Sequence, residues 1–107
     1  MTVLKNDGRW DKSNVDFRNN SVEYNKKKPS KNMKYIDYGL NIVDSAIFND
    51  FPYNKTFDLS DVFEDLSSRN MLAGLEIYAR FYEIGSINGL NDTINFFKQK
   101  EIKKHDV

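Results

Sequence analysis

Apolar and polar side chains alternate in two short stretches near the start of the chain, residues 15–17 and 22–24. An alternation of period two places the apolar side chains on one face of a strand. The polar segment 18–21 between them contains two asparagines, which tolerate the positive φ angles of a tight turn. The pattern therefore predicts a β-hairpin. Because Pro29 cannot donate a hydrogen bond to a sheet, the lysine-rich segment 26–30 is predicted to be a loop.

Two further strands, each followed by a helix, are predicted in the rest of the chain. Aromatic and β-branched residues fill segments 35–43 and 75–81, as is typical of strands. Apolar residues then recur every three or four positions after Asp58 or Ser60 and again after Ser86. Aspartate and serine are residue types that cap helix N-termini, so an amphipathic helix is expected to begin at each place.

This order of elements indicates an α/β domain with a mixed sheet, a β-hairpin and two main helices, which spans residues 1–107 without an internal boundary. One additional helical turn is expected at 44–48. The first main helix is expected to end at 69–70. The polar segment 98–107 is expected to be a frayed tail of the second helix.

Composition narrows the possible functions. The 107 residues include 16 basic and 16 acidic side chains, no cysteine and a single histidine, His105. Zero formal charge provides no overall field to attract nucleic acid or an anionic membrane. The lack of thiols excludes disulfides, cysteine-based zinc sites and thiol catalysis. No apolar run reaches the ~18 residues that cross a bilayer. We therefore expect a cytoplasmic protein without nucleic-acid or membrane partners.

Four places carry candidate chemistry. The lysine cluster 26–28 is suited to gripping a phosphate group, although such clusters are more often solvated loops. Asp37, inside an apolar strand pattern, needs hydrogen-bond partners, which are either sugar hydroxyls or a neighbouring loop. Gly39 in the same pattern marks a position that a ligand or a second backbone can approach closely. Glu83 precedes a helix, where it is either a ligand for a hard cation or simply solvated.

Three segments in this order resemble the C-terminal half of the sugar-1-phosphate nucleotidyltransferases. They are VEYNKK (22–27), MKYIDYGL (33–40) and FYEIGSINGL (81–90). The resemblance covers roughly residues 2 to 100 and is nearest to the mannose- or heptose-1-phosphate guanylyltransferase-like branch. It implies a partial Rossmann-like, GT-A-like domain whose first, nucleotide-binding half is missing from this chain.

The resemblance also assigns roles to residues. Lys26 matches the catalytic lysine that contacts the sugar phosphate, and Asn25 stands where the family usually has an acid. Asp37 and Gly39 match sugar-binding positions. Glu83 matches a carboxylate that binds Mg²⁺, with glutamate in place of the usual aspartate.

The implied reaction joins a nucleoside triphosphate to a sugar 1-phosphate and releases pyrophosphate. The nucleotide side lies in the missing half, so the resemblance implies little turnover by this chain alone and a complementary N-terminal chain as a partner. The alternative is a non-catalytic remnant that binds sugar phosphates or another subunit. A third hypothesis, an RNA-binding hairpin, requires strong salt-dependent binding. A sheet edge left open is expected to cause homo-oligomerisation.

Overall fold

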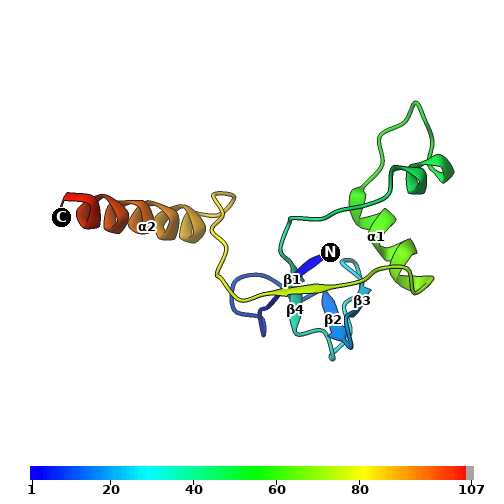
Figure 1. Ribbon diagram of the computed structural model, residues 1–107, viewed down its shortest axis with the longest axis horizontal. Coiled ribbons are helices and arrows are strands. Elements are labelled where there is room, and N and C mark those ends of the chain that lie inside the picture. The colour runs from blue at the N-terminus through cyan, green and yellow to red at the C-terminus, as the bar shows by residue number, and fades with distance from the viewer. Residues whose placement is uncertain (106–107) are drawn as a thin grey trace.

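The computed structural model describes residues 1–105; residues 106 and 107 lie outside the described part. It confirms an α/β architecture, with a five-stranded mixed sheet and helices (Figure 1). The elements in chain order are β1 (Thr2–Lys5), β2 (Val15–Arg18), β3 (Ser21–Tyr24), β4 (Tyr35–Asp37), the 3₁₀ helix η1 (Ser45–Asp50), α1 (Leu59–Ser68), β5 (Leu75–Ile77) and α2 (Ile87–His105).

The predicted hairpin is confirmed as β2 and β3. Val15 pairs with Tyr24 at its open end. At its tip, Asn19 and Asn20 have φ angles of 50° and 62°. Asparagine adopts this left-handed region more readily than most residues, because its short polar side chain bonds locally.

The sheet order is β3-β2-β4-β1-β5, and strand directions decide which loops meet. Strands β3 and β4 are both antiparallel to β2, so they run in the same direction. Val15 pairs with both Tyr24 and Tyr35, which aligns the end of β3 with the start of β4. Residues that follow Tyr24 and Tyr35 therefore advance toward the same end of the sheet.

Helix α1 covers one face of the sheet and closes the core. Asp58 caps it by accepting a hydrogen bond from the Ser60 amide at 2.9 Å. The helix buries Val62, Phe63 and Leu66, at the spacing predicted for its apolar face. The strand side chains in the same core are Val3, Val15, Val22 and Tyr24.

Both later strands are shorter than the sequence predicts. The expected strand 35–43 ends at Asp37, because the chain turns at Gly39, whose φ is +94°. The expected strand 75–81 ends at Ile77. It lies at the edge of the sheet with β1 as its partner. Beyond it, Tyr78 is exposed, and Phe81 packs on Trp10 and Tyr38, which lie in loops rather than on a strand.

Helix α2 begins directly after Ser86, as predicted, but it continues as helix through 98–105, where the sequence analysis expects a frayed tail. Fraying of these turns stays a prediction. None of its described residues is buried, and the helix projects away from the sheet (Figure 1). The radius of gyration is accordingly 16.7 Å, against about 13 Å for a compact chain of this length. Among the helices of residues 1–105, none is both long and apolar enough to cross a bilayer.

Candidate functional site

One end of the sheet brings together four of the five residues singled out from the sequence. Asn25 and Lys26 follow the last residue of β3, while Asp37 ends β4 and Gly39 comes two residues later. Since β3 and β4 run in the same direction with β2 between them, the two pairs leave the sheet at the same end. Two strand spacings, about 10 Å, separate β3 from β4.

Within the lysine cluster, only part of the charge is already engaged. The Lys27 ammonium pairs with Asp61 of α1 at 3.0 Å. Lys26 makes no ion pair within residues 1–105, but its positive charge acts on Asp58, the N-cap residue of α1. Hydrogen bonds from Ser60 lower the pKa of Asp58, and the charges of Lys26 and Lys27 lower it further. Lys28 likewise makes no ion pair within these residues, so Lys26 and Lys28 are the cations of the cluster that stay available for an external anion.

The loop is shaped by Asn25. The Asn25 Oδ1 accepts a hydrogen bond from the Lys28 backbone amide at 2.9 Å. The backbone amide of Asn25 donates to the Asn14 carbonyl at 3.0 Å. This is an Asx-type turn, in which a short polar side chain replaces a backbone acceptor. Asn25 therefore orients the chain that carries Lys26, and its side-chain oxygen is occupied in doing so.

Asp37 caps the loop that follows β4. Its carboxylate accepts hydrogen bonds from the Gly39 amide at 2.9 Å and from the Asn41 side chain at 3.1 and 3.3 Å. These contacts correspond to the loop-capping role that the sequence leaves open. Space around Gly39 is open, since a Cβ placed there meets no atom within 4 Å. The backbone turn is therefore accessible to a ligand.

The electrostatic field at this end is partly negative. Burial raises the pKa of Tyr24 to about 12, and the charges of Asp37, Asp58 and Glu64 add to the effect. The influence of Asp37 on Tyr24 agrees with the strand register, which places β4's end near β3's end. The Tyr24 phenol consequently remains protonated and able to donate a hydrogen bond at neutral pH.

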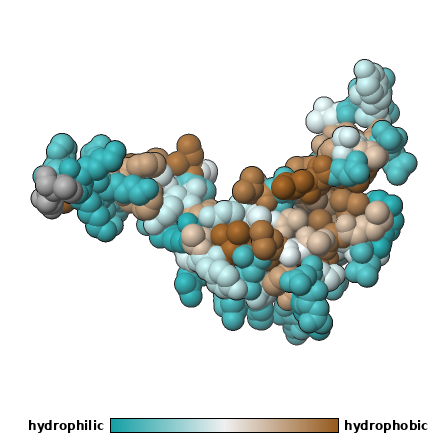
Figure 2. Space-filling model, viewed as in Figure 1, coloured by the Kyte–Doolittle hydropathy of each residue, from teal (hydrophilic) through white to brown (hydrophobic). Residues whose placement is uncertain are grey.

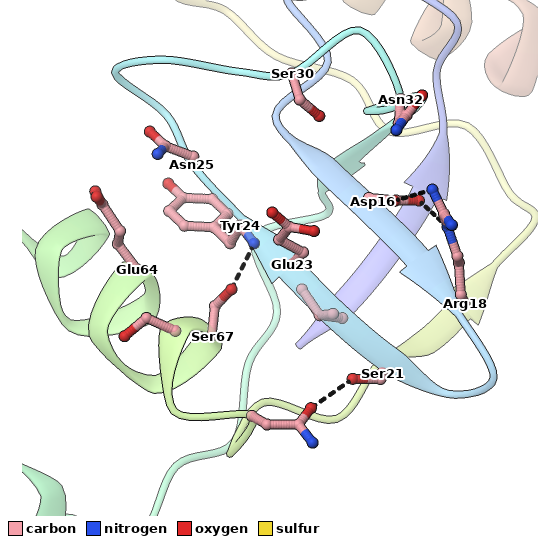
Figure 3. Close-up of a pocket in the computed structure, with 13 residues that line it drawn as sticks. Asp16, Arg18, Ser21, Glu23, Tyr24, Asn25, Ser30, Asn32, Glu64 and Ser67 are labelled. Atoms are coloured by element: carbon pink, nitrogen blue, oxygen red, sulfur yellow. Dashed lines mark hydrogen bonds and ion pairs between the residues drawn. The ribbon is translucent and has the colours of Figure 1, made fainter.

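A groove of about 760 Å³ lies between the hairpin and α1, next to this end (Figure 3). Asn25 and Tyr24 line it from β3 and the loop after it, and Glu64 and Ser67 line it from α1. The Tyr24 amide donates to the Ser67 hydroxyl at 2.8 Å, which ties the two walls together. Its lining is rich in hydroxyl, amide and carboxylate groups, the chemistry that binds polar ligands.

Glu83 lies in a different place, in the loop between β5 and α2. One of its oxygens accepts from the Gly85 and Ser86 amides at 2.6 and 3.1 Å, and the other accepts from the Ser86 hydroxyl at 2.6 Å. Ser86 in turn accepts from the Gly89 amide at 3.0 Å. Residues 83–86 therefore form the N-terminal cap of α2. The sequence predicts Ser86 as the cap, and the structure adds the Glu83 carboxylate to it.

The cap makes a testable pH prediction. The hydrogen bond from the Ser86 hydroxyl, with those from the two amides, holds the pKa of Glu83 below its ordinary value. A carboxylate with a depressed pKa stabilises the folded cap fully above its unfolded pKa, near 4.5, and loses this effect as the pH falls through the folded value. Amide exchange measured by NMR is expected to show protection of Ser86 and Gly89 that decreases in acid.

The Glu83→Gln variant provides the control for this measurement. It keeps a side-chain oxygen but cannot change its charge, so its amide protection at the start of α2 is expected to be lower than in the parent at neutral pH and independent of acid. Equal pH profiles for the two proteins would show that Glu83 does not cap the helix.

The loop with Glu83 is held to the sheet by an aromatic cluster. The Phe81 ring makes edge contacts with Trp10, the single tryptophan, at 6.0 Å and with Tyr38 at 6.3 Å. The Arg80 guanidinium lies over the rings of Trp10 and Tyr82, at 5.4 and 4.7 Å, and pairs with Asp92 at 2.6 Å. A second hollow of about 380 Å³ lies here, lined by Arg80, Glu83 and Arg9 among others.

The sequence analysis does not identify this aromatic cluster. Buried Asn6 fixes the loop that presents Trp10, by accepting from the Trp10 amide at 3.0 Å and donating to the Asp11 carbonyl at 2.6 Å. A tryptophan in a polar loop, next to Arg9, was the available signal, since an isolated large aromatic residue usually packs against something. Its partner, Phe81, is too distant in sequence for any local pattern to indicate.

Residues 1–105 do not provide enough ligands in one place to hold a Mg²⁺ ion. Within residues 1–105, no group of three or more acidic or histidine side chains is arranged to hold a metal ion. Glu83 offers one carboxylate, and both of its oxygens already accept hydrogen bonds. Asp92 lines the same hollow but pairs with Arg80. These side chains alone therefore do not fit a magnesium site.

Comparisons of the chain with protein-family models, curated proteins and solved structures give no match.

Proposed function

We propose that this chain is the acceptor half of a sugar-1-phosphate nucleotidyltransferase, with a Rossmann-like, GT-A-like fold in the complete domain. Its substrate class is a sugar 1-phosphate, either mannose- or heptose-1-phosphate, and guanylyl transfer is the proposed reaction. The proposal rests on the resemblance of residues 22–27, 33–40 and 81–90 to that family, together with the arrangement of the sheet.

The observation that supports the proposal best is the common direction of β3 and β4. It puts Lys26 and the open backbone turn at Gly39 at the same end of the sheet, after two strands that have only β2 between them. A phosphorylated sugar has an anionic end and a hydroxyl-bearing end, which suit a lysine and a polar turn respectively. The groove beside Asn25 adds further polar groups at this end.

In this function the chain binds and orients the nucleophile. The phosphate oxygen of a sugar 1-phosphate is already anionic, so attack on the α-phosphorus of the nucleoside triphosphate requires no general base. Bond formation to phosphorus releases pyrophosphate as the leaving group. The contribution of Lys26 is to neutralise and position the attacking phosphate, which is the main form of catalysis in phosphoryl transfer.

The nucleotide side belongs to a complementary segment in this proposal. Glu83, whose two carboxylate oxygens already cap α2, does not fit the role of magnesium ligand that the resemblance implies, so the complementary segment supplies the metal ligands in this proposal. Mg²⁺ would add charge neutralisation at the phosphates.

Substrate binding by the chain itself tests the proposal. Mannose 1-phosphate is titrated into the ¹⁵N-labelled protein, with mannose and inorganic phosphate as separate controls. Shifts of the Asn25, Lys26 and Gly39 amides are expected with mannose 1-phosphate and are expected to be weaker with each control. Equal shifts with inorganic phosphate would indicate a general anion site, and the absence of shifts at this end of the sheet would contradict the proposal.

A non-catalytic binding module is the second candidate. The observation that favours it is Glu83, whose carboxylate is engaged in capping α2. Such a module binds the sugar phosphate but forms no nucleotide sugar when GTP and the nucleotide-binding segment are added. Pyrophosphate release in that mixture distinguishes the two candidates.

A further inference from the structure

The groove between the hairpin and α1 contains a tyrosine whose hydroxyl group has no partner among residues 1–105. The Tyr24 side chain is 5% exposed, and its ring meets the Phe63 ring edge-on in the core. Figure 3 shows the phenol oxygen at the groove, between Asn25 of the loop after β3 and Glu64 of α1. Burial and neighbouring charges act on this hydroxyl, but no hydrogen bond does. Because buried polar groups are normally hydrogen-bonded, the unpartnered phenol indicates a position for a ligand.

Glu64 is the acid of α1 that stays without a partner within the same residues. It is half-buried, it lines the groove, and it makes no ion pair or hydrogen bond with residues 1–105. Ser67, three positions later on the same face of the helix, lines the groove as well. The neighbouring acids are each engaged by an amide or a basic side chain: Asp58 by the Ser60 amide, Asp61 by Lys27 and Asp65 by Arg69. An unpaired carboxylate and an unpaired phenol therefore share this part of the groove.

The electrostatic field at these two groups is negative. Burial raises the pKa of Tyr24 to about 12, and the carboxylates around it, Glu64 among them, contribute to the shift. Lys27 is close enough to Glu64 for the two charges to interact, but the Lys27 ammonium bonds Asp61 at 3.0 Å. A positively charged ligand is therefore favoured beside Glu64, and an anionic ligand is repelled.

A second acid extends this field along the edge of β3. Glu23 lines the same groove and makes no ion pair within residues 1–105, while the Arg18 guanidinium bonds Asp16 at 2.8 Å. The groove measures about 760 Å³, within the range of about 300–1,000 Å³ that is usual for small-molecule sites. Figure 2 shows that the outer border of α1 and the hairpin is mainly hydrophilic, whereas hydrophobic surface gathers between the two helices. The ligand that suits this groove is therefore small, polar and cationic.

An ammonium group fits these partners better than a metal ion. No group of three or more acidic or histidine side chains within residues 1–105 is placed to hold a metal. An ammonium group is a compact charge with three rotatable donors, and it requires only oxygen acceptors around it. The Glu64 carboxylate and the Tyr24 phenol oxygen are two such acceptors.

We propose that the groove binds small aliphatic amines, whose ammonium group is held by the Glu64 carboxylate and the Tyr24 hydroxyl. A diamine places its second ammonium group toward Glu23, the other acid of the groove. The proposed enzymatic function uses Lys26 and the turn at Gly39 instead, so the amine site does not depend on that function.

Titration of the ¹⁵N-labelled chain with 1,4-diaminobutane at neutral pH tests the site. Shifts of the Tyr24, Glu64 and Ser67 amides are expected as the diamine is added. Butane-1,4-diol has the same chain length but hydroxyl groups in place of the ammonium groups, and it is expected to leave these amides unshifted. Sodium chloride at the same ionic strength is the second control, and it is also expected to leave them unshifted.

Two substitutions that preserve the size of the side chain test the two contacts. Glu64→Gln is expected to weaken diamine binding about tenfold, because it removes the charge that strengthens the hydrogen bond. Tyr24→Phe removes the hydroxyl but keeps the ring in the core, and it is expected to weaken binding about threefold. Glu101→Gln and Tyr53→Phe make the same changes at exposed positions outside the groove, and both are expected to bind like the parent. Isothermal titration calorimetry measures the affinities, and urea titration checks that each variant is folded.

The proposal is wrong if the amides of the groove do not respond to the diamine. It is equally wrong if butane-1,4-diol shifts them as strongly, because the groove then recognises hydroxyl groups rather than positive charge. Equal shifts with sodium chloride would reduce the effect to screening by salt. Unchanged affinity in folded Glu64→Gln or Tyr24→Phe protein would show that the amine binds elsewhere on the surface.

Discussion

Replacing Phe63 with alanine is expected to lower the free energy of unfolding by about 3–5 kcal/mol, the usual cost of removing a buried aromatic ring. Phe63 is 3% exposed, and its ring meets the edge of Tyr24 at a centroid distance of 6.0 Å. It joins α1 to the hairpin, and few other side chains fill this small core. Because small domains are stable by only about 5–15 kcal/mol, this loss is a large share of the total, and the variant is expected to unfold at a much lower urea concentration than the parent. Urea titration followed by circular dichroism measures the change.

Tyr53→Ala is the matched control, because it also removes an aromatic ring but from a fully exposed position. It is expected to change the unfolding free energy by less than about 0.5 kcal/mol. If Phe63→Ala were as stable as this control, α1 would not pack on the hairpin in the way described.

The elements that could be predicted from the sequence are those with local signals. The hairpin is marked by alternation and by the asparagines at its tip, and both features act within a few residues. Helix α1 is marked by its cap at Asp58 and by the spacing of its apolar face. These signals act on the local backbone conformation and do not depend on distant contacts, so the hairpin and α1 form where the sequence predicts them.

The ends of β4 and β5 depend instead on contacts between distant segments. A residue such as Tyr78 has high β-propensity, yet it is 83% exposed beyond the end of β5. β-propensity mainly reflects packing on a neighbouring strand, and here the strand beside β5 is the four-residue β1. The position of β4 between β1 and β2 has no local sequence signal either.

For the candidate site, residue types can be read from the sequence, but the sequence does not show which side chains are already bound to a neighbour in the fold. It grouped Lys26 with its two lysine neighbours, and only the fold shows that Lys27 is engaged by Asp61. It left Asp37 between two roles, and the position of Asn41 and the turn at Gly39 give the carboxylate a capping role. Such differences arise from side chains that meet only after the chain has folded.

Lys26→Ala is expected to reduce turnover by about 10²–10³-fold when the chain is assayed with the nucleotide-binding segment, GTP, Mg²⁺ and mannose 1-phosphate. The basis is the typical loss when one donor to a developing phosphate or oxyanion charge is removed. Pyrophosphate release is the measurement. Because Lys26 has no ion pair within residues 1–105 and Phe63 and its neighbours form the core elsewhere, the urea midpoint is expected to stay unchanged.

Lys31→Ala removes a lysine from the same loop region and is the control, expected to retain turnover within about threefold of the parent. Lys26→Arg separates charge from shape, because arginine keeps the charge but presents it as a planar fork. Partial rescue by arginine would support neutralisation of the phosphate as the role of Lys26. Equal losses in Lys26→Ala and Lys31→Ala would instead show that the loop attracts the anion only through its summed charge, and Lys26 would then have no specific part in the site.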